Sequence, residues 1–126
     1  MSSIRRVYLV GSLRDDGVPD LAQILRKDGH EVFDEWFSAG PIADDSWQKH
    51  QQAKGVPYRE ALRGPAAQHI FEFDKKWLSW ADTVVMVGKG TSRGIELGWA
   101  VGRGAEGFVM LAEEPERWDV MLAFAK

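Results

Sequence analysis

Hydrophobic and polar residues alternate along this chain in blocks that predict β-strands separated by α-helices. Short apolar runs typical of buried parallel strands cover residues 6–11, 31–36, 82–87 and 107–111. Helical spacing of apolar residues predicts helices at 20–26, 65–80 and 95–103, and a final short helix at 116–125. The helix at 65–80 opens on Pro65, a residue favoured at a first helical position, and carries an apolar stripe of Ile70, Phe73, Trp77 and Ala81.

The order of these elements predicts an α/β fold. Strands that alternate with helices form a parallel sheet with right-handed crossovers, so we expect a flavodoxin-like or Rossmann-like, doubly wound sheet of about four to five strands. A length of 126 residues predicts that residues 1–126 form a single domain. Residues 37–64 interrupt the alternation, and we expect an inserted loop or lid there, with a short helix around 46–53.

Composition excludes several classes of function. The chain contains no cysteine, which excludes a disulfide scaffold and thiol chemistry. The net charge of −3 does not suggest a nucleic-acid polymer as a partner, because such proteins usually present a basic face. With no signal-peptide pattern and no apolar run near the ~20 residues of a membrane span, we expect a cytoplasmic protein without a membrane partner. The three histidines lack metal-ligand spacing, so neither a metal nor a cofactor is expected.

Ligands of such sheets bind beyond the carboxyl ends of the strands, where the strand order reverses. The segments 11–17, 34–36 and 88–94 are expected to meet there. The first offers amide, hydroxyl and guanidinium donors for an anion, from Gly11, Ser12 and Arg14. The third is a Gly-rich turn that lacks the Gly-Lys-Ser/Thr ending of a P-loop and is misplaced for a dinucleotide fingerprint; it contains Ser92, Arg93 and Gly94. Most of the six tryptophans are expected to pack in the core or an interface, the alternative being that one or two of them face a planar ligand, and Trp36 is a candidate substrate-binding residue.

Two carboxylates are the candidate catalytic groups. Glu96 falls in the first turn of the helix predicted at 95–103, where the helix dipole favours an ionised carboxylate that can attack an electrophilic carbon. Asp74 has apolar neighbours at 73, 77 and 78, a setting that raises the pKa of a carboxyl towards that of a general acid. Each residue alone is also an ordinary helix residue. Together at a sugar they match the nucleophile and proton donor of a retaining glycosidase.

Three segments in this order resemble the nucleoside 2-deoxyribosyltransferase superfamily, and most closely its nucleoside 5′-monophosphate N-glycosidases. They are YLVGSLR at residues 8–14, FDKKWLSWAD at 73–82 and GIELGWA at 94–100. The resemblance implies a flavodoxin-like sheet and a homodimer or larger homo-oligomer whose subunits share the active site. Residues 91–94 form a shorter loop than in those hydrolases, and the C-terminal portion is also short.

The resemblance further implies roles for individual residues. Glu96 would form an ester with C1′ of the sugar, Tyr8 would orient that carboxylate, and Asp74 would contact the sugar or protonate the departing base. Ser12 and Ser92 stand where the hydrolases hold the 5′-phosphate, and Asp82 would cap a strand.

The expected function is therefore cleavage of the N-glycosidic bond of a nucleoside or deoxynucleoside 5′-monophosphate, with a small-molecule nucleotide as the partner. One alternative is base exchange between deoxynucleosides, which differs only in whether water or a second base attacks the glycosyl ester. A second alternative is a nucleotide sensor that binds without turnover, although such a protein has no need of a nucleophile. A cytokinin-activating phosphoribohydrolase is disfavoured because the Pro-Gly-Gly-x-Gly-Thr motif is absent.

Overall fold

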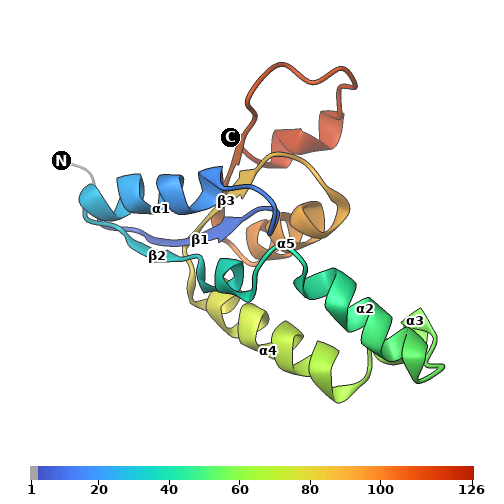
Figure 1. Ribbon diagram of the computed structural model, residues 1–126. Helices are drawn as coiled ribbons and strands as arrows, with labels where there is room; N and C mark the ends of the chain where they lie inside the picture. The colour runs from blue at the N-terminus through green and yellow to red at the C-terminus, as the bar shows by residue number, and fades with distance from the viewer. Residues whose placement is uncertain (1–2) are drawn as a thin grey trace.

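The computed structural model describes residues 3–126, and strands and helices alternate through most of this range (Figure 1). In chain order the elements are β1 (Arg6–Val10), α1 (Gly17–Lys27), β2 (Glu31–Phe33), the 3₁₀ helix η1 (Glu35–Ala39), α2 (Ala43–Ala53), α3 (Tyr58–Ala61), α4 (Pro65–Trp80), β3 (Thr83–Val87), α5 (Thr91–Gly102), β4 (Glu106–Met110) and the 3₁₀ helix η2 (Val120–Phe124).

The strands form one four-stranded sheet with the order β2-β1-β3-β4, and every neighbouring pair is parallel. The order reverses between β1 and β3. α1 covers one face of the sheet, and α4 and α5 cover the other (Figure 1). The doubly wound parallel fold expected from the sequence is confirmed, and its ligand-binding edge lies where β1 and β3 end.

Alternate residues of β1 supply the two halves of the core. Tyr8 and Val10 face α4 and α5, where they pack with Phe33, Leu78, Met86 and Leu97. Val7 and Leu9 face α1, where they pack with Val18 and Ala22. Because successive side chains of a strand point to opposite faces, this alternation directs Tyr8 towards the side of the sheet that carries both candidate carboxylates.

Several predicted element ends differ from the structure. α1 begins at Gly17, three residues before its predicted start. The second strand ends at Phe33 rather than at Trp36, because the amide of Phe37 donates to the carbonyl of Asp34 and starts η1. α5 begins at Thr91, four residues before the predicted start. The predicted helix at 116–125 is only the 3₁₀ turn η2, which the side chain of Asp119 caps by accepting a hydrogen bond from the amide of Met121.

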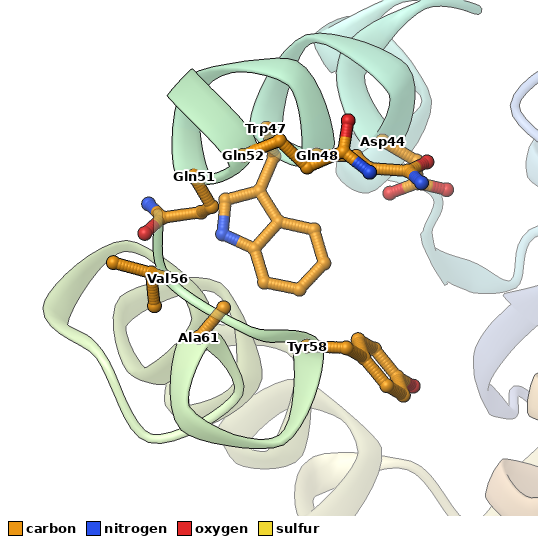
Figure 2. A pocket seen from close by; sticks show the side chains of 8 residues that line it. All are labelled: Asp44, Trp47, Gln48, Gln51, Gln52, Val56, Tyr58 and Ala61. Atoms are coloured by element: carbon orange, nitrogen blue, oxygen red, sulfur yellow. The ribbon is translucent and has the colours of Figure 1, made fainter. Parts of the chain in front are cut away.

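Residues 37–64 are mostly helical rather than a loop. They contain the end of η1, all of α2 and the single turn of α3, and α2 and α3 project away from the sheet beside the start of α4 (Figure 1). The indole of Trp47 on α2 lies over α3 and meets Tyr58 edge-on, with ring centroids 6.5 Å apart (Figure 2). The function of this segment as a lid stays a prediction.

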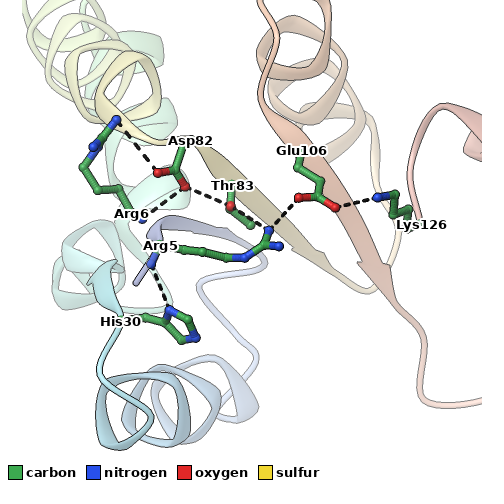
Figure 3. Close-up of polar contacts among 7 residues, drawn as sticks. All are labelled: Arg5, Arg6, His30, Asp82, Thr83, Glu106 and Lys126. Atoms are coloured by element: carbon green, nitrogen blue, oxygen red, sulfur yellow. Dashed lines mark hydrogen bonds and ion pairs between the residues drawn. The ribbon is translucent and has the colours of Figure 1, made fainter. Parts of the chain in front are cut away.

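A polar network ties the amino ends of the strands together at the edge opposite the candidate site (Figure 3). Asp82 accepts hydrogen bonds from the amide of Arg6 (3.1 Å) and the hydroxyl of Thr83 (2.9 Å), which agrees with a capping role. Glu106 pairs with Arg5 (2.7 Å) and Lys126 (2.6 Å). None of the helices in the described part of the chain is long and apolar enough to span a membrane.

Candidate functional site

The two candidate carboxylates lie close together around a buried tyrosine. Tyr8 comes from β1, Asp74 from α4 and Glu96 from α5. The ring of Tyr8 stacks on Phe33 with centroids 5.2 Å apart, and Phe33 stacks on Trp77 at 5.0 Å, so aromatic packing holds the tyrosine in place. Its hydroxyl is within hydrogen-bonding reach of the Glu96 carboxylate. The structure thus brings together the three residues predicted to be catalytic.

Burial and mutual repulsion change the acidity of these groups. Burial, together with the negative charge of Asp74, raises the pKa of Glu96 to about 7, although the hydrogen bond from Tyr8 opposes the rise. Burial raises the pKa of Asp74 to about 6, in the direction that its apolar neighbours indicate. Burial and the two carboxylates raise the pKa of Tyr8, which keeps its hydroxyl protonated as a hydrogen-bond donor. Between about pH 6 and pH 7 the carboxyl pair therefore holds close to one proton, mainly on Glu96, which is the weaker acid of the two.

The predicted reason for ionisation of Glu96 is wrong. Because α5 begins at Thr91, Glu96 lies in the second turn of the helix, where the dipole of the helix start acts weakly. The environment of Glu96 favours the neutral acid instead, since its pKa is raised. A raised pKa places the carboxylate in the range where an enzyme both ionises and protonates it near neutral pH.

A pocket of about 170 Å³ opens at the carboxyl ends of β1 and β3. It gathers the residues predicted to hold a phosphate from two loops, and its lining is Gly11, Ser12, Leu13, Arg14, Pro41, Asp44, Gly90, Ser92 and Arg93. The first amides of α5 have no carbonyl partner within the helix and border this pocket. Helix-start amides, serine hydroxyls and guanidinium groups are donors suited to an anion.

Both arginines of this pocket already have partners. The Nη2 atom of Arg14 lies 2.9 Å from Oδ2 of Asp45 at the start of α2, and both side chains are more than half exposed. Arg93 donates to the carbonyls of Val87 and Lys89, and so braces the turn that carries Gly88. Gly88 has a positive φ of 76°, which only glycine adopts without strain. A phosphate would therefore compete with Asp45 for Arg14.

This donor-lined pocket and the carboxylate pair share α5. Ser92 lines the pocket, and Glu96 follows it by four residues, so their side chains lie on the same helix face about 5–6 Å apart at Cβ. A ligand whose anionic group sits in the pocket can therefore place its reactive carbon near Glu96, a single helical turn further along α5.

Two predicted binding residues, Trp36 and Gly94, do not line this pocket. The indole N–H of Trp36 donates to the carbonyl of Leu9 (2.7 Å), and its ring packs beneath the end of β1. A Cβ on Gly11 would come within 3.5 Å of that ring and 2.7 Å of Val18 Cγ2, so glycine lets α1 and Trp36 close against the strand. Gly94 lies within the first turn of α5, where its amide bonds to the carbonyl of Gly90.

The acidic residues of α2 that adjoin the donor-lined pocket were not predicted from the sequence. Asp44 lines it and Asp45 pairs with Arg14, but the only signal was two adjacent aspartates in a segment expected to be a loop. His30 proves structural, because its Nδ1 accepts a hydrogen bond from the amide of Arg5. Within residues 3–126, no cluster of three or more His, Cys, Asp or Glu could hold a metal ion.

No model of a known protein family matches this sequence, and no curated protein matches it. The chemistry of the site therefore follows from its geometry: two carboxyl groups of raised pKa, a tyrosine between them and a donor-lined pocket a single helical turn away.

Proposed function

We propose that this protein hydrolyses the N-glycosidic bond of a nucleoside 5′-monophosphate through a glycosyl ester on Glu96. The observation that carries the proposal is the pair Asp74 and Glu96, which holds close to one proton near neutral pH beside a pocket that suits a phosphate. One ionised and one protonated carboxyl are what a two-step displacement at a sugar requires. The reactive form is the one in which the single proton has moved from Glu96, the weaker acid in the unliganded protein, to Asp74.

In the first step a Glu96 oxygen attacks C1′, the bond from C1′ to the base nitrogen breaks, and Asp74 gives its proton to the departing base. In the second step water attacks C1′ and loses a proton to Asp74, and the bond from C1′ to the Glu96 oxygen breaks, which releases the sugar phosphate and restores both carboxyl groups. Tyr8 donates its hydroxyl hydrogen bond to Glu96 and fixes the position of the attacking oxygen. Ser12, Ser92 and Arg14 hold the 5′-phosphate.

The proposal is tested by incubating the purified protein with a panel of nucleosides and their monophosphates, with and without an acceptor base, and separating the products by chromatography. Hydrolysis predicts free base and sugar phosphate from monophosphates, whether or not an acceptor is present. A new nucleoside formed only with the acceptor would support base exchange instead. Binding of nucleotides without any product would support a sensor.

Removal of the Arg14 guanidinium is expected to weaken the use of monophosphates. A charge-assisted hydrogen bond to phosphate contributes about 1.5–3 kcal/mol, so Arg14→Ala should lower kcat/KM for the monophosphate by roughly ten- to a hundredfold and leave the plain nucleoside unchanged. Asp45→Asn is the matched control, because it removes the carboxylate that competes for the same guanidinium, and it should strengthen the preference for monophosphate. A wild-type protein that prefers the unphosphorylated nucleoside would favour base exchange over hydrolysis.

We also propose that the chain assembles into a homodimer or larger homo-oligomer. The apolar stripe predicted on α4 is covered only at its carboxyl end, whereas Ile70 is 56% exposed, Phe71 54% and Phe73 42%. Ile95 on the neighbouring helix α5 is 67% exposed. Light scattering should give at least twice the chain mass, and Ile70→Glu should shift the protein towards the monomer. A strict monomer with full activity would contradict both the interface and a shared active site.

A further inference from the structure

A second pocket, of about 250 Å³, lies between α2 and α3 and is not used by the proposed reaction (Figure 2). The indole of Trp47 extends from α2 towards α3, and Tyr58 closes one side. The complete lining is Asp44, Trp47, Gln48, Gln51, Gln52, Val56, Tyr58 and Ala61.

The two pockets adjoin each other at Asp44, which lines both. Asp44, Trp47, Gln48 and Gln51 are spaced i, i+3, i+4 and i+7, so they share one face of α2. That face therefore runs for two helical turns, about 10 Å, from the edge of the phosphate pocket into the second pocket. A molecule held by its phosphate at Ser12 and Arg14 can extend in two directions, along α5 to Glu96 and along α2 to Trp47.

The lining of the second pocket selects the chemistry of its occupant. Two aromatic rings provide surfaces for a planar group, and three glutamine amides provide both donors and acceptors for its edge. The Trp47 indole N–H is buried without a hydrogen-bond partner among residues 3–126. Among the described residues that line this pocket the only charged one is Asp44, so the pocket offers no cation for a phosphate, and the group that occupies it is one without a phosphate of its own. Pockets for whole small ligands measure about 300–1,000 Å³, so this one suits a single heterocycle rather than an entire nucleotide.

We propose that the pocket between α2 and α3 binds a second, uncharged or cationic heterocycle that is joined to the substrate through its 5′-phosphate. The substrate class is then a dinucleotide in which two nucleosides are linked through their 5′-phosphates, with one glycosidic bond at Glu96 and the other base against Trp47 and Tyr58. This inference rests on the proposed function, because it assigns the phosphate to the pocket at Ser12 and Arg14.

The test compares affinities by titration calorimetry in a Glu96→Gln background, which prevents turnover. The probes are nucleoside 5′-monophosphates and the corresponding symmetrical 5′,5′-linked dinucleoside diphosphates. We expect the dinucleoside diphosphate to bind about tenfold more tightly or better, since a stacked ring with one or two hydrogen bonds contributes on the order of 1–2 kcal/mol. Tyr58→Ala and Gln51→Ala should each remove much of that gain and leave the affinity for the monophosphate unchanged. Tyr58 is 72% exposed, so removal of its side chain spares the fold.

His50→Ala is the matched control, because His50 lies on α2 but does not line the pocket. It should change neither affinity. Equal affinities for the two probes would overturn this inference, and so would equal losses of affinity for both probes in Tyr58→Ala and Gln51→Ala. Either result would leave the proposed function in place if the wild type cleaves monophosphates. If neither probe binds, the proposed function falls together with it.

Discussion

Glu96→Gln is expected to lower kcat for glycosidic cleavage by roughly 10⁴- to 10⁶-fold, as the loss of a catalytic nucleophile does elsewhere. The amide preserves the shape of the side chain and can still accept the hydrogen bond from Tyr8, but it carries no charge with which to attack C1′. The measurement is single-turnover release of the free base. Glu72→Gln is the matched control on α4, because Glu72 is an exposed helix residue, and it should retain full activity. Wild-type activity in Glu96→Gln would exclude Glu96 as the nucleophile.

Thermal unfolding of the same variant shows whether its fold is intact. The pKa of Glu96 is raised from 4.5 to about 7 in the folded state, so ionisation costs more in the folded protein than in the unfolded chain. The stability that protonated Glu96 provides is therefore lost as the pH rises from about 4.5 to about 7. Above that window the folded protein bears the full free-energy cost of the buried, ionised carboxylate. Glu96→Gln lacks this penalty and should be more stable than the wild type near pH 8, by roughly 1–3 kcal/mol. Near pH 4 the difference should vanish.

Asp74→Asn is expected to lower kcat/KM by roughly 10²- to 10⁴-fold and to change the shape of the pH profile. In the wild type the singly protonated pair is productive, which gives a bell with a maximum between about pH 6 and pH 7. Asparagine removes the general acid, so activity should no longer fall at high pH, where the wild type loses the proton of Asp74. It also removes the repulsion that raises the pKa of Glu96, so the remaining rise in activity should move to lower pH.

A substrate with a better leaving group separates proton donation from a structural effect. A 7-methylguanine nucleotide already carries a positive base, which departs without receiving a proton. Asp74→Asn should therefore slow its cleavage much less than that of the unmethylated nucleotide. Equal losses for both substrates, or a bell that persists in the variant, would show that Asp74 is not the general acid.

Most of the fold follows from local sequence patterns. The strands β1, β3 and β4 are continuous apolar runs, and α4 spans the predicted residues 65–80, because these elements pack directly against one core. Errors lie where polar side chains or turns decide the end of an element. β2 ends early because the carbonyl of Asp34 accepts the hydrogen bond that starts a 3₁₀ turn. α5 starts early because the carbonyl of Gly90 accepts a hydrogen bond from the amide of Gly94.

Most residues of the candidate site were predictable from the sequence, whereas the acidic residues of α2 and the interactions between residues were not. Parallel topology alone places residues 11–14 beside residues 90–93, so the position of the donor-lined pocket follows from strand order. The pairing of Arg14 with Asp45 joins residues 31 positions apart across a segment without strand periodicity, and no sequence pattern reports it. The raised pKa of Glu96 likewise depends on burial and on a carboxylate from another helix, both of which are tertiary properties.

The proposed reaction depends above all on a covalent bond between Glu96 and C1′ of the sugar. The most direct test is to incubate the protein with 2′-fluoro nucleoside 5′-monophosphates, which slow release of the glycosyl ester, and to measure the intact mass and the modified peptide by mass spectrometry. We expect an added mass equal to one fluorinated sugar phosphate less one water, located on the peptide that contains Glu96 and absent from Glu96→Gln. Base release without any adduct, or an adduct on a residue other than Glu96, would contradict the proposed reaction.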